Sequence, residues 1–233
     1  MKPRIGILRP GSTFGGMIER FGDYDAWFAR ELGSLQVRCD VYDLEAGPPP
    51  DPDQADGWVI TGARSSLTDG TASTERLLAW TAEAIARERP LLGVCYGHQV
   101  VCAAAGGRVE RNPAGWELGT VEVELTPAGC EDPLFAGFPR RFRVQTTHED
   151  FVSRPPPGAT VLAENDHTPV QAVAIGPACR GVQFHPEVTP PIARDFVTRR
   201  GHLVSPPAQV SDAPLAGRVL ANFVESFVQP RAT

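Results

Sequence analysis

The sequence predicts an α/β fold, an open and mostly parallel sheet flanked by helices, with additional antiparallel strands in its second half. Short apolar segments alternate with amphipathic helices before residue 107, which is typical of a parallel sheet wrapped by helices. From residue 120 the segments alternate with a period of two, and no linker separates the halves. Residues 1–233 are therefore expected to form a single domain.

The first half is expected to supply four strands and three helices. The strands are predicted over 4–8, 36–42, 58–61 and 91–94, and the helices over 23–32, 74–89 and 97–105. In the first helix, Trp27, Phe28 and Leu32 recur at helical intervals. The segment over 91–94 is wholly apolar, as expected of a central parallel strand. Serial prolines make 47–53 a surface loop, because they can neither continue a helix nor donate to a sheet.

The second half is expected to add short strands and two closing helices. The strands are predicted over 120–125, 141–145, 160–163, 170–175 and 181–184, and the helices over 192–199 and 215–227. The Gly-rich segment over 11–16 lacks a following lysine, so it indicates a mobile loop near the site rather than a phosphate-binding loop. Loops over 11–16, 62–70 and 201–212 are where substrate specificity is expected.

Charge and hydropathy exclude two classes of partner. Lys and Arg total 22 against 28 Asp and Glu, a formal net charge of −6, so nucleic-acid binding by bulk electrostatics is not expected. No apolar run approaches the ~18 residues needed to cross a bilayer, so no membrane association is expected. The apolar stretch over 5–8 is too short for a signal peptide.

The chain has five cysteines, an odd number. No two form a CxxC pair or a finger-like pair with histidine, so neither a disulfide framework nor a structural metal is expected. These features indicate a cytoplasmic enzyme with reduced thiols. Four cysteines are interpreted as core fillers: Cys39, Cys102, Cys130 and Cys179.

The fifth, Cys95, lies in the most informative stretch, PLLGVCYGHQ over 90–99. An apolar strand leads directly into a helix, with Gly93 and Gly97 two residues either side of the cysteine. This G-x-C-x-G spacing is the thiol form of the nucleophile elbow, a tight turn that raises the sulfur above the sheet. The helix N-terminus would stabilise a thiolate, and the N–H of Tyr96 would point where an oxyanion forms. A buried, unreactive cysteine is the competing interpretation.

A base for this thiol is found in GVQFHPE over 181–187. The apolar strand delivers His185 at its carboxyl end, where open α/β sheets bind ligands. Glu187 follows beyond a proline that stiffens the turn, so its carboxylate can reach back and orient the imidazole. Together with the cysteine turn, this segment predicts a nucleophile, a base and an orienting acid.

The two motifs, GVCYGHQ and GVQFHPE, resemble those of the class I, triad-type glutamine amidotransferases. GDYDAWF, DGWVITG, GWELGT and THEDFV extend the resemblance, toward the free-standing branch related to the amidotransferase domain of GMP synthase. The resemblance covers most of the chain. It implies the class I glutamine amidotransferase-like fold, with Cys95 as nucleophile, His185 as base and Glu187 as its orienting group.

The resemblance also implies roles for residues around the triad. The oxyanion hole would consist of the N–H groups of Tyr96 and Ala63, with Gly62 permitting the bend; Arg64 stands where a proline is common. Gln99 would contact the substrate glutamine. The amino-acid end of the glutamine would lie on the segment Thr147, His148, Glu149 and Asp150, in which Glu149 replaces the usual glycine.

The implied reaction is hydrolysis of the glutamine side-chain amide through a cysteine thioester, with no metal and no cofactor. Ammonia would pass to a separate synthetase subunit, because the sequence lacks an ATP-binding loop that could activate an acceptor. Three alternatives stay open: a γ-glutamyl peptidase or hydrolase acting on a γ-glutamyl amide or glutathione conjugate, a non-catalytic binding or regulatory subunit, and a stress-type cysteine hydrolase.

Overall fold

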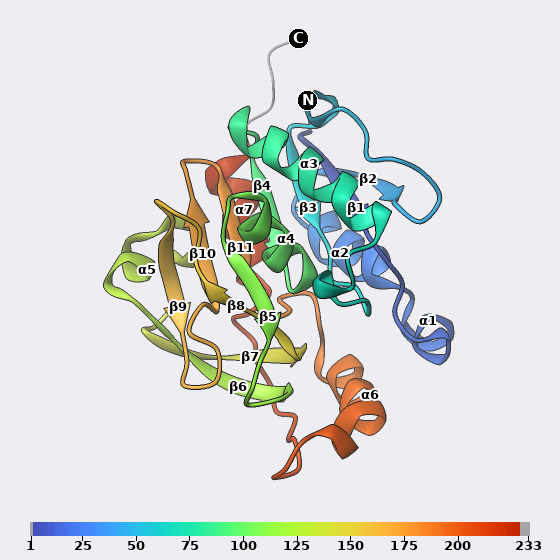
Figure 1. Cartoon of the computed structure of the whole chain (residues 1–233), viewed down its shortest axis with the longest axis vertical. Coiled ribbons are helices and arrows are strands. Elements are labelled where there is room, and N and C mark those ends of the chain that lie inside the picture. The colour runs from blue at the N-terminus through green and yellow to red at the C-terminus, as the bar shows by residue number, and fades with distance from the viewer. Residues whose placement is uncertain (1, 229–233) are drawn as a thin grey trace.

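The computed structural model describes residues 2–228 and contains a nine-stranded sheet (Figure 1). The strand order is β2-β1-β3-β4-β11-β10-β9-β6-β7. In chain order the strands are β1 (Arg4–Arg9), β2 (Arg38–Asp43), β3 (Gly57–Ile60), β4 (Leu91–Val94), β6 (Glu117–Leu125), β7 (Arg141–His148), β9 (Thr160–Glu164), β10 (Ala172–Ile175) and β11 (Cys179–Val182). The sheet thus combines strands from both halves of the chain, and the predicted fold class is confirmed.

The sheet changes character at β11. The strands from β2 to β11 are parallel to their neighbours, whereas β11, β10, β9, β6 and β7 pair antiparallel. β4 and β11 are hydrogen-bonded neighbours, with Gly93 opposite Gly181 and Val94 opposite Val182. The chain segments that precede Cys95 and His185 therefore lie side by side in the sheet.

Helices cover both faces of the parallel half. The α-helices are α1 (Gly15–Phe21), α2 (Tyr24–Gly33), α3 (Ala72–Ala86), α4 (Tyr96–Ala104), α5 (Pro127–Glu131), α6 (Pro190–Arg200) and α7 (Arg218–Phe227), and the short 3-10 turns are η1 (Pro52–Gln54), η2 (Leu67–Asp69), η3 (Pro133–Phe135) and η4 (Gly201–Leu203). α3 and α4 lie on one face, and α2 and α7 lie on the other (Figure 1). Two separate apolar layers result.

The apolar pattern explains these layers. Every residue of β3 and of β4 is buried, as expected of parallel strands covered on both faces. In α7, Val219, Leu220, Phe223 and Val224 are buried, so one stripe of the helix faces the sheet. α3 begins two residues before its predicted start because the Thr71 hydroxyl accepts a hydrogen bond from the N–H of Thr74, and it ends at Ala86.

The sequence pattern did not predict three features, namely α1, α5 and a small antiparallel sheet of β5 (Arg108–Arg111) and β8 (Asp150–Arg154). α1 begins at Gly15, inside the predicted loop over 11–16, because Met17 packs in an apolar cluster with Phe196 of α6. This is a tertiary contact, and the local sequence carries no signal for it. For α5 a signal was present, since Thr126 is the N-cap and Pro127 the first helical residue.

Except for β4, each predicted strand of the large sheet differs from the structure by one to three residues at one end or both, and β2 and β11 are two examples. β2 begins at Arg38 rather than at residue 36, because Gln36 has a left-handed backbone with φ 59°. β11 ends at Val182, so His185 lies three residues beyond the strand rather than directly at its end. There the backbone N–H groups of Gln183 and His185 donate to the carbonyls of Gln171 and Gln145.

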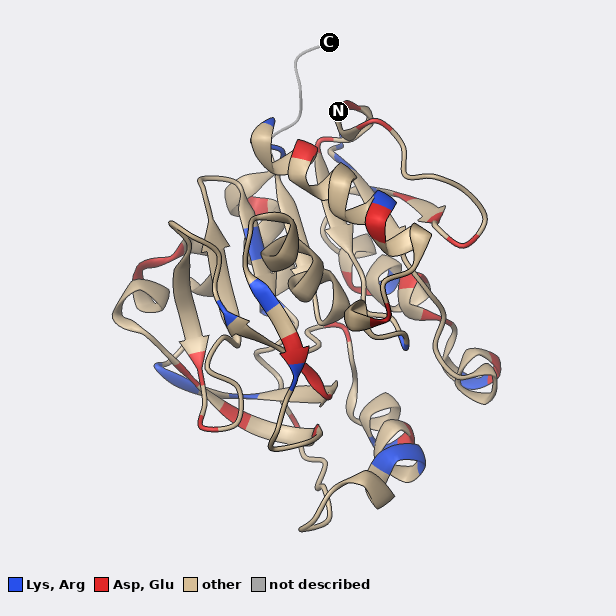
Figure 2. Cartoon of the chain, viewed as in Figure 1, with Lys and Arg blue, Asp and Glu red and all other residues tan. Residues whose placement is uncertain are grey.

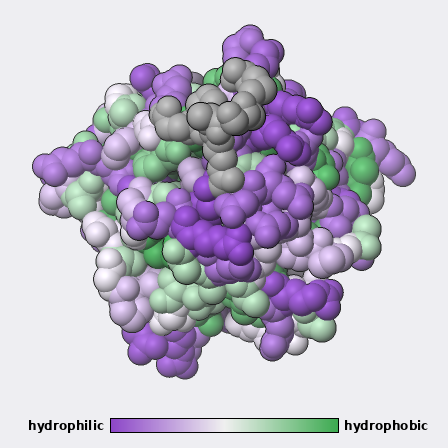
Figure 3. Space-filling model, turned by 90° about the horizontal axis from the view of Figure 1, so that it is seen from above, coloured by the Kyte–Doolittle hydropathy of each residue, from purple (hydrophilic) through white to green (hydrophobic). Residues whose placement is uncertain are grey.

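Within residues 2–228, no helix is long and apolar enough to cross a membrane. Acidic and basic residues are interspersed over the elements in the view of Figure 2. The face seen from above in Figure 3 mixes hydrophilic and hydrophobic residues. Large hydrophobic side chains that are exposed in the described part of the chain are Ile18, Val41 and Leu203.

Candidate active site

Cys95 occupies a strained turn between β4 and α4. Its φ is 53° and its ψ is −103°, a conformation that L-residues seldom adopt and that is typical of nucleophile elbows. Its N–H donates to the carbonyl of Val182 in β11 (2.9 Å), which fixes the turn on the sheet. The side chain is 5% exposed and lines a cavity. The thiol is therefore not sealed beneath the sheet.

The two glycines around Cys95 are required by close backbone approaches. A Cβ on Gly93 would lie 2.3 Å from the carbonyl oxygen of Gly97, and a Cβ on Gly97 would lie 2.2 Å from the carbonyl oxygen of Ile60. The strand before the cysteine and the helix after it thus fold back on each other, and α4 rests directly on β3. Only glycine permits this at both positions.

We expect Gly97→Ala to lower the free energy of unfolding by about 1–3 kcal/mol, because the added methyl must push α4 away from β3. Gly33→Ala is the matched control: Gly33 is the last residue of α2, and nothing lies within 4 Å of a Cβ built there. Urea unfolding of both variants measures the difference. Equal stabilities would contradict the assignment of a steric role to Gly97.

His185 and Glu187 form a buried pair. Nδ1 of His185 is 2.7 Å from Oε1 of Glu187, and each residue is 1% exposed. The imidazole lies between the rings of Tyr24 and Phe196, with centroid distances of 6.3 and 6.5 Å. Burial alone would lower the pKa of His185, but the charges of Glu187 and Cys95 raise it above the ordinary value. Within residues 2–228, Nε2 of His185 has no hydrogen-bond partner.

Gly62, in the turn after β3, packs against the His185 ring. A Cβ on Gly62 would lie 3.0 Å from Cε1 of His185 and 3.3 Å from the Tyr24 ring, so the turn packs tightly against both rings. Ala63, the next residue, lines the cavity together with Cys95 and Tyr96. The N–H of Tyr96 is at the first position of α4 and lies outside the helical hydrogen-bond ladder. The geometry thus gathers all three predicted oxyanion-hole residues around Cys95 and His185.

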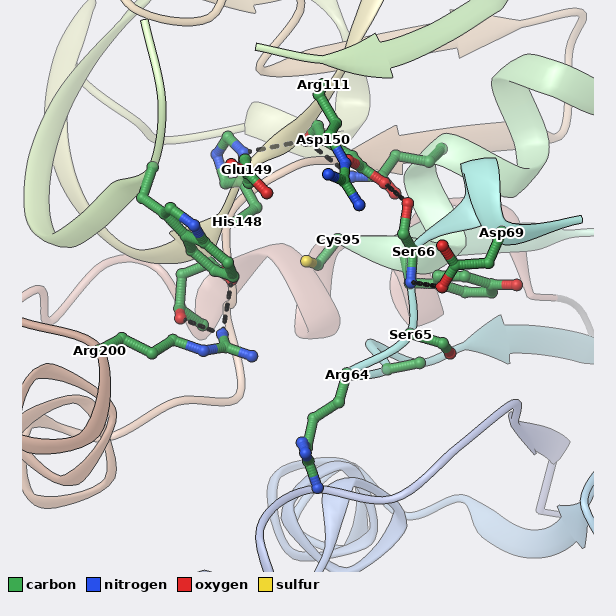
Figure 4. A pocket seen from close by; sticks show the side chains of 15 residues that line it. Arg64, Ser65, Ser66, Asp69, Cys95, Arg111, His148, Glu149, Asp150 and Arg200 are labelled. Carbon is green, nitrogen blue, oxygen red and sulfur yellow. Dashed lines mark hydrogen bonds between the residues drawn. The ribbon is translucent and has the colours of Figure 1, made fainter. Parts of the chain in front are cut away.

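The cavity has a volume of about 250 Å³ (Figure 4). The residues that line it are Ala63, Arg64, Ser65, Ser66, Asp69, Cys95, Tyr96, Gln99, Arg111, Trp116, Thr147, His148, Glu149, Asp150 and Arg200. Eight of the eleven predicted site residues are in this set, whereas Gly62, His185 and Glu187 are not part of the lining. The predicted specificity loop over 62–70 supplies part of the lining.

Hydrogen bonds inside the protein hold the wall over 147–150. Nε2 of Gln99 donates to the carbonyl of Asp150 (2.9 Å). Nδ1 of His148 bonds the same carbonyl (3.1 Å), and its Nε2 bonds Oε2 of Glu117 (2.9 Å). Both ring nitrogens of His148 are therefore engaged, and the nitrogen of Gln99 is engaged as well. Both residues line the cavity and also brace the segment over 147–150.

Glu117 is the centre of a buried polar network. Its carboxylate accepts hydrogen bonds from Asn165 (2.7 Å) and Gln171 (2.8 Å) in addition to its bond with His148. Burial raises the pKa of Glu117, but the hydrogen bond and charge of His148, together with the hydrogen bonds from Asn165 and Gln171, hold it below the ordinary value. Sequence reasoning missed this network, because its members come from separate elements.

Glu149 and Arg200 carry charges in the cavity without an ion pair among the described residues. Glu149 is half-buried, and its side chain makes no hydrogen bond or ion pair within residues 2–228, although its carbonyl accepts from Asn112. Arg200 is 8% exposed and was not a predicted site residue. An arginine at a helix end is ordinarily a favourable helix-dipole contact, so its sequence position carries no signal for a site.

The other cysteines follow the core prediction only in part. Cys102 and Cys179 are buried, Cys39 is half-buried, and Cys130 is exposed, so the prediction is wrong for Cys130. No group of three His, Cys, Asp or Glu side chains that could hold a metal ion is present within residues 2–228.

Comparison with known proteins identifies the family. Residues 17–202 match the model of the class-I glutamine amidotransferases. The chain is 36% identical over 174 residues to the glutamine-hydrolyzing GMP synthase of Aeropyrum pernix, covering 72% of this chain and 31% of that protein. It is 36% identical over 146 residues to a separate subunit of the glutamine-hydrolyzing GMP synthase of Ignicoccus hospitalis, covering 60% of this chain and 71% of that polypeptide.

A solved structure shares the fold. The glutamine amidotransferase from Methylobacillus flagellatus superposes with a TM-score of 0.79 at 20% identity, covering 100% of this chain and 98% of that one. The chain spans about a third of the length of the first curated relatives it matches, which are GMP synthases. The family match and the identities to these relatives show that this chain belongs to the class-I glutamine amidotransferases, in the branch related to GMP synthase.

Proposed function

We propose that this protein hydrolyses the side-chain amide of glutamine through a thioester on Cys95 and releases ammonia for a separate acceptor-activating partner. One observation carries the proposal: Cys95 lines a cavity from a strained turn at the start of α4, the segment before it is paired in the sheet with the segment that leads to His185, and Glu187 holds the imidazole at Nδ1. Acyl transfer by a cysteine requires a nucleophile, a base beside it and an acid that orients the base. The proposal gives these roles to Cys95, His185 and Glu187.

In the first half of the proposed reaction the Cys95 thiolate attacks the side-chain carbonyl carbon of glutamine. The carbonyl oxygen becomes an oxyanion, and the N–H groups of Ala63 and Tyr96 donate to it. His185, protonated at Nε2, gives its proton to the amide nitrogen as the carbon–nitrogen bond breaks. Ammonia leaves, and the glutamyl group stays on the sulfur as a thioester.

In the second half a water molecule attacks the thioester. His185 now takes a proton from the water at Nε2, which Glu187 leaves available by accepting the hydrogen bond of Nδ1. The carbon–sulfur bond breaks, glutamate leaves, and the thiolate is restored. The chemistry needs no group beyond these side chains and backbone donors.

The cavity favours glutamine over larger γ-glutamyl compounds. Its volume of about 250 Å³ is below the ~300–1,000 Å³ that is typical of sites for drug-sized ligands. Relatives named GMP synthase make a GMP-forming synthetase the first partner to test, and the relative that is a separate GMP synthase subunit supports placing that synthetase on another chain.

The test measures glutamate and ammonia released by the purified protein from glutamine, glutathione and a series of γ-glutamyl amides of increasing size. We expect glutamine alone to be turned over, with one ammonia per glutamate, and faster turnover when the synthetase is added. Turnover of the bulky amides but not of glutamine would identify a γ-glutamyl hydrolase instead. No release from any substrate, with or without the partner, would support a binding or regulatory role.

A further inference from the structure

We propose that Arg200 binds the α-carboxylate of the substrate's γ-glutamyl group and so selects amino acids over simple amides. The inference rests on the proposed function, because it names a specificity residue for that same cavity. Its basis is the contrast between the burial of this guanidinium and its lack of a carboxylate partner among the described residues.

Arg200 is the last residue of α6, and its side chain enters the cavity that Cys95 lines. Three aromatic rings surround the guanidinium: its Cζ is 4.6 Å from the ring centre of Trp116, 5.3 Å from that of Phe14 and 5.5 Å from that of Phe196. Burial is the largest influence on its pKa and lowers it. The fold thus holds a cation in apolar surroundings, at a cost in solvation.

No carboxylate compensates this charge within residues 2–228. Arg180 is an apt comparison, because it is 7% exposed against 8% for Arg200, and its Nε forms an ion pair with Asp132 at 3.0 Å. In the described part of the chain Arg200 donates only to Thr147, from Nη1 to the carbonyl (3.2 Å) and the hydroxyl (2.5 Å). Of the nearby charged groups, Tyr24 and Cys95 raise the pKa of Arg200 and the second cation, Arg64, lowers it; none of the three is a carboxylate. An anion entering this part of the cavity would offset both the cost of burying the Arg200 charge and the repulsion between Arg200 and Arg64.

The remaining nitrogens of Arg200 suit a carboxylate. Nε and Nη2 make no hydrogen bond within residues 2–228, and their two N–H groups are parallel, which is the arrangement that binds both oxygens of a carboxylate. In Figure 4 the guanidinium points from the α6 side toward the middle of the cavity. One edge is therefore anchored to Thr147, which leaves the hydrogen-bonding groups of the other edge available to a ligand.

The anchor at Thr147 indicates which carboxylate is bound. Thr147 begins the wall over 147–150, which the proposed function assigns to the amino-acid end of glutamine. A substrate whose amide carbon lies at Cys95 would direct its α-carbon toward this wall. Arg200 is tied to that wall by two hydrogen bonds, so the α-carboxylate is the group within its reach.

The test compares glutamine with its α-amide, in which a neutral carboxamide replaces the α-carboxylate. Binding of both is measured by calorimetry in a Cys95→Ala background, with Arg200 intact and with Arg200→Met, which keeps the stem packed against the aromatic rings. We expect Arg200→Met to weaken glutamine binding about 10- to 100-fold and α-amide binding less than about threefold. Arg200→Lys keeps the charge but lacks the parallel N–H groups. Its glutamine affinity is expected to lie between those of the protein with Arg200 intact and of Arg200→Met.

Arg199→Gln is the matched control, because Arg199 is the preceding residue of α6, lies near Phe14 and pairs with Asp195 outside the cavity lining. It should leave the ratio of the two affinities unchanged. Thermal unfolding of each variant, with iodoacetamide labelling of Cys95 in the parent background, verifies that the site is intact.

Equal weakening of both ligands by Arg200→Met would overturn the inference and leave Arg200 as a structural residue. The same holds if the protein with Arg200 intact binds both ligands equally, or binds neither. Glutamate release is measured in parallel and judges the proposed function separately: carboxylate-dependent binding without turnover would support the inference while contradicting the hydrolase.

Discussion

Cys95→Ala is expected to abolish glutamate release from glutamine, with a loss of more than about 10⁴-fold, because no other group in the cavity can form the thioester. Glutamine binding should persist, since the cavity walls and Arg200 are untouched. Glutamate formation in an enzyme-coupled assay measures the rate, and calorimetry measures the binding. The positive φ of Cys95 strains alanine and cysteine alike, so thermal unfolding should change little.

Cys130→Ala is the control for this experiment. Cys130 is an exposed thiol of α5, outside the cavity lining, so its replacement should leave the rate unchanged. Substantial glutamate release by Cys95→Ala, or an equal loss on replacing Cys130, would remove the basis for a thioester at position 95.

Glu187→Gln is expected to lower kcat by about 10²–10⁴-fold while changing glutamine affinity little. The glutamine side chain has the same shape, but its NH₂ group can donate to Nδ1 of His185, which would place the ring proton on Nε2 and remove the base. The glutamate charge also raises the pKa of His185, so its loss lowers that pKa. The acid limb of the kcat profile should therefore move to lower pH.

Rates measured from pH 5 to 9 and glutamine titrations test this expectation. Glu131→Gln, at an exposed carboxylate of α5, is the control and should leave rate and profile as they are. A Glu187→Gln protein with an unshifted profile and near-normal kcat would show that the carboxylate does not act on His185 during the reaction.

Most of the sheet could be predicted because its information is local. The segment over 91–94 is apolar at all positions, and β4 has those bounds. The cysteine turn could be predicted for the same reason, since Gly93 and Gly97 sit next to the residue they serve. The small sheet of β5 and β8 could not, because Arg108–Arg111 gains its partner only when a segment forty residues away folds beside it.

The candidate site also combines features that neighbouring residues determine with features that depend on distant segments. The pairing of His185 with Glu187 is local and is present in the structure. The roles of His148 and Arg200 depend on distant segments: Glu117 lies 31 residues from His148, and Thr147 lies 53 residues from Arg200. A single sequence carries no signal for such contacts, so neither the bond between His148 and Glu117 nor the place of Arg200 in the cavity lining was predicted.

The pairing of β4 with β11 brings together the segments that carry Cys95 and His185, which lie far apart in the sequence. Val94 and Val182 are register partners, and the amide of Cys95 extends the ladder to the carbonyl of Val182. Main-chain hydrogen bonds consequently hold the backbone of Cys95 against the strand that leads to His185. A nascent chain that stops before β11, or a proteolytic piece lacking it, would therefore not bring the proposed nucleophile and base together.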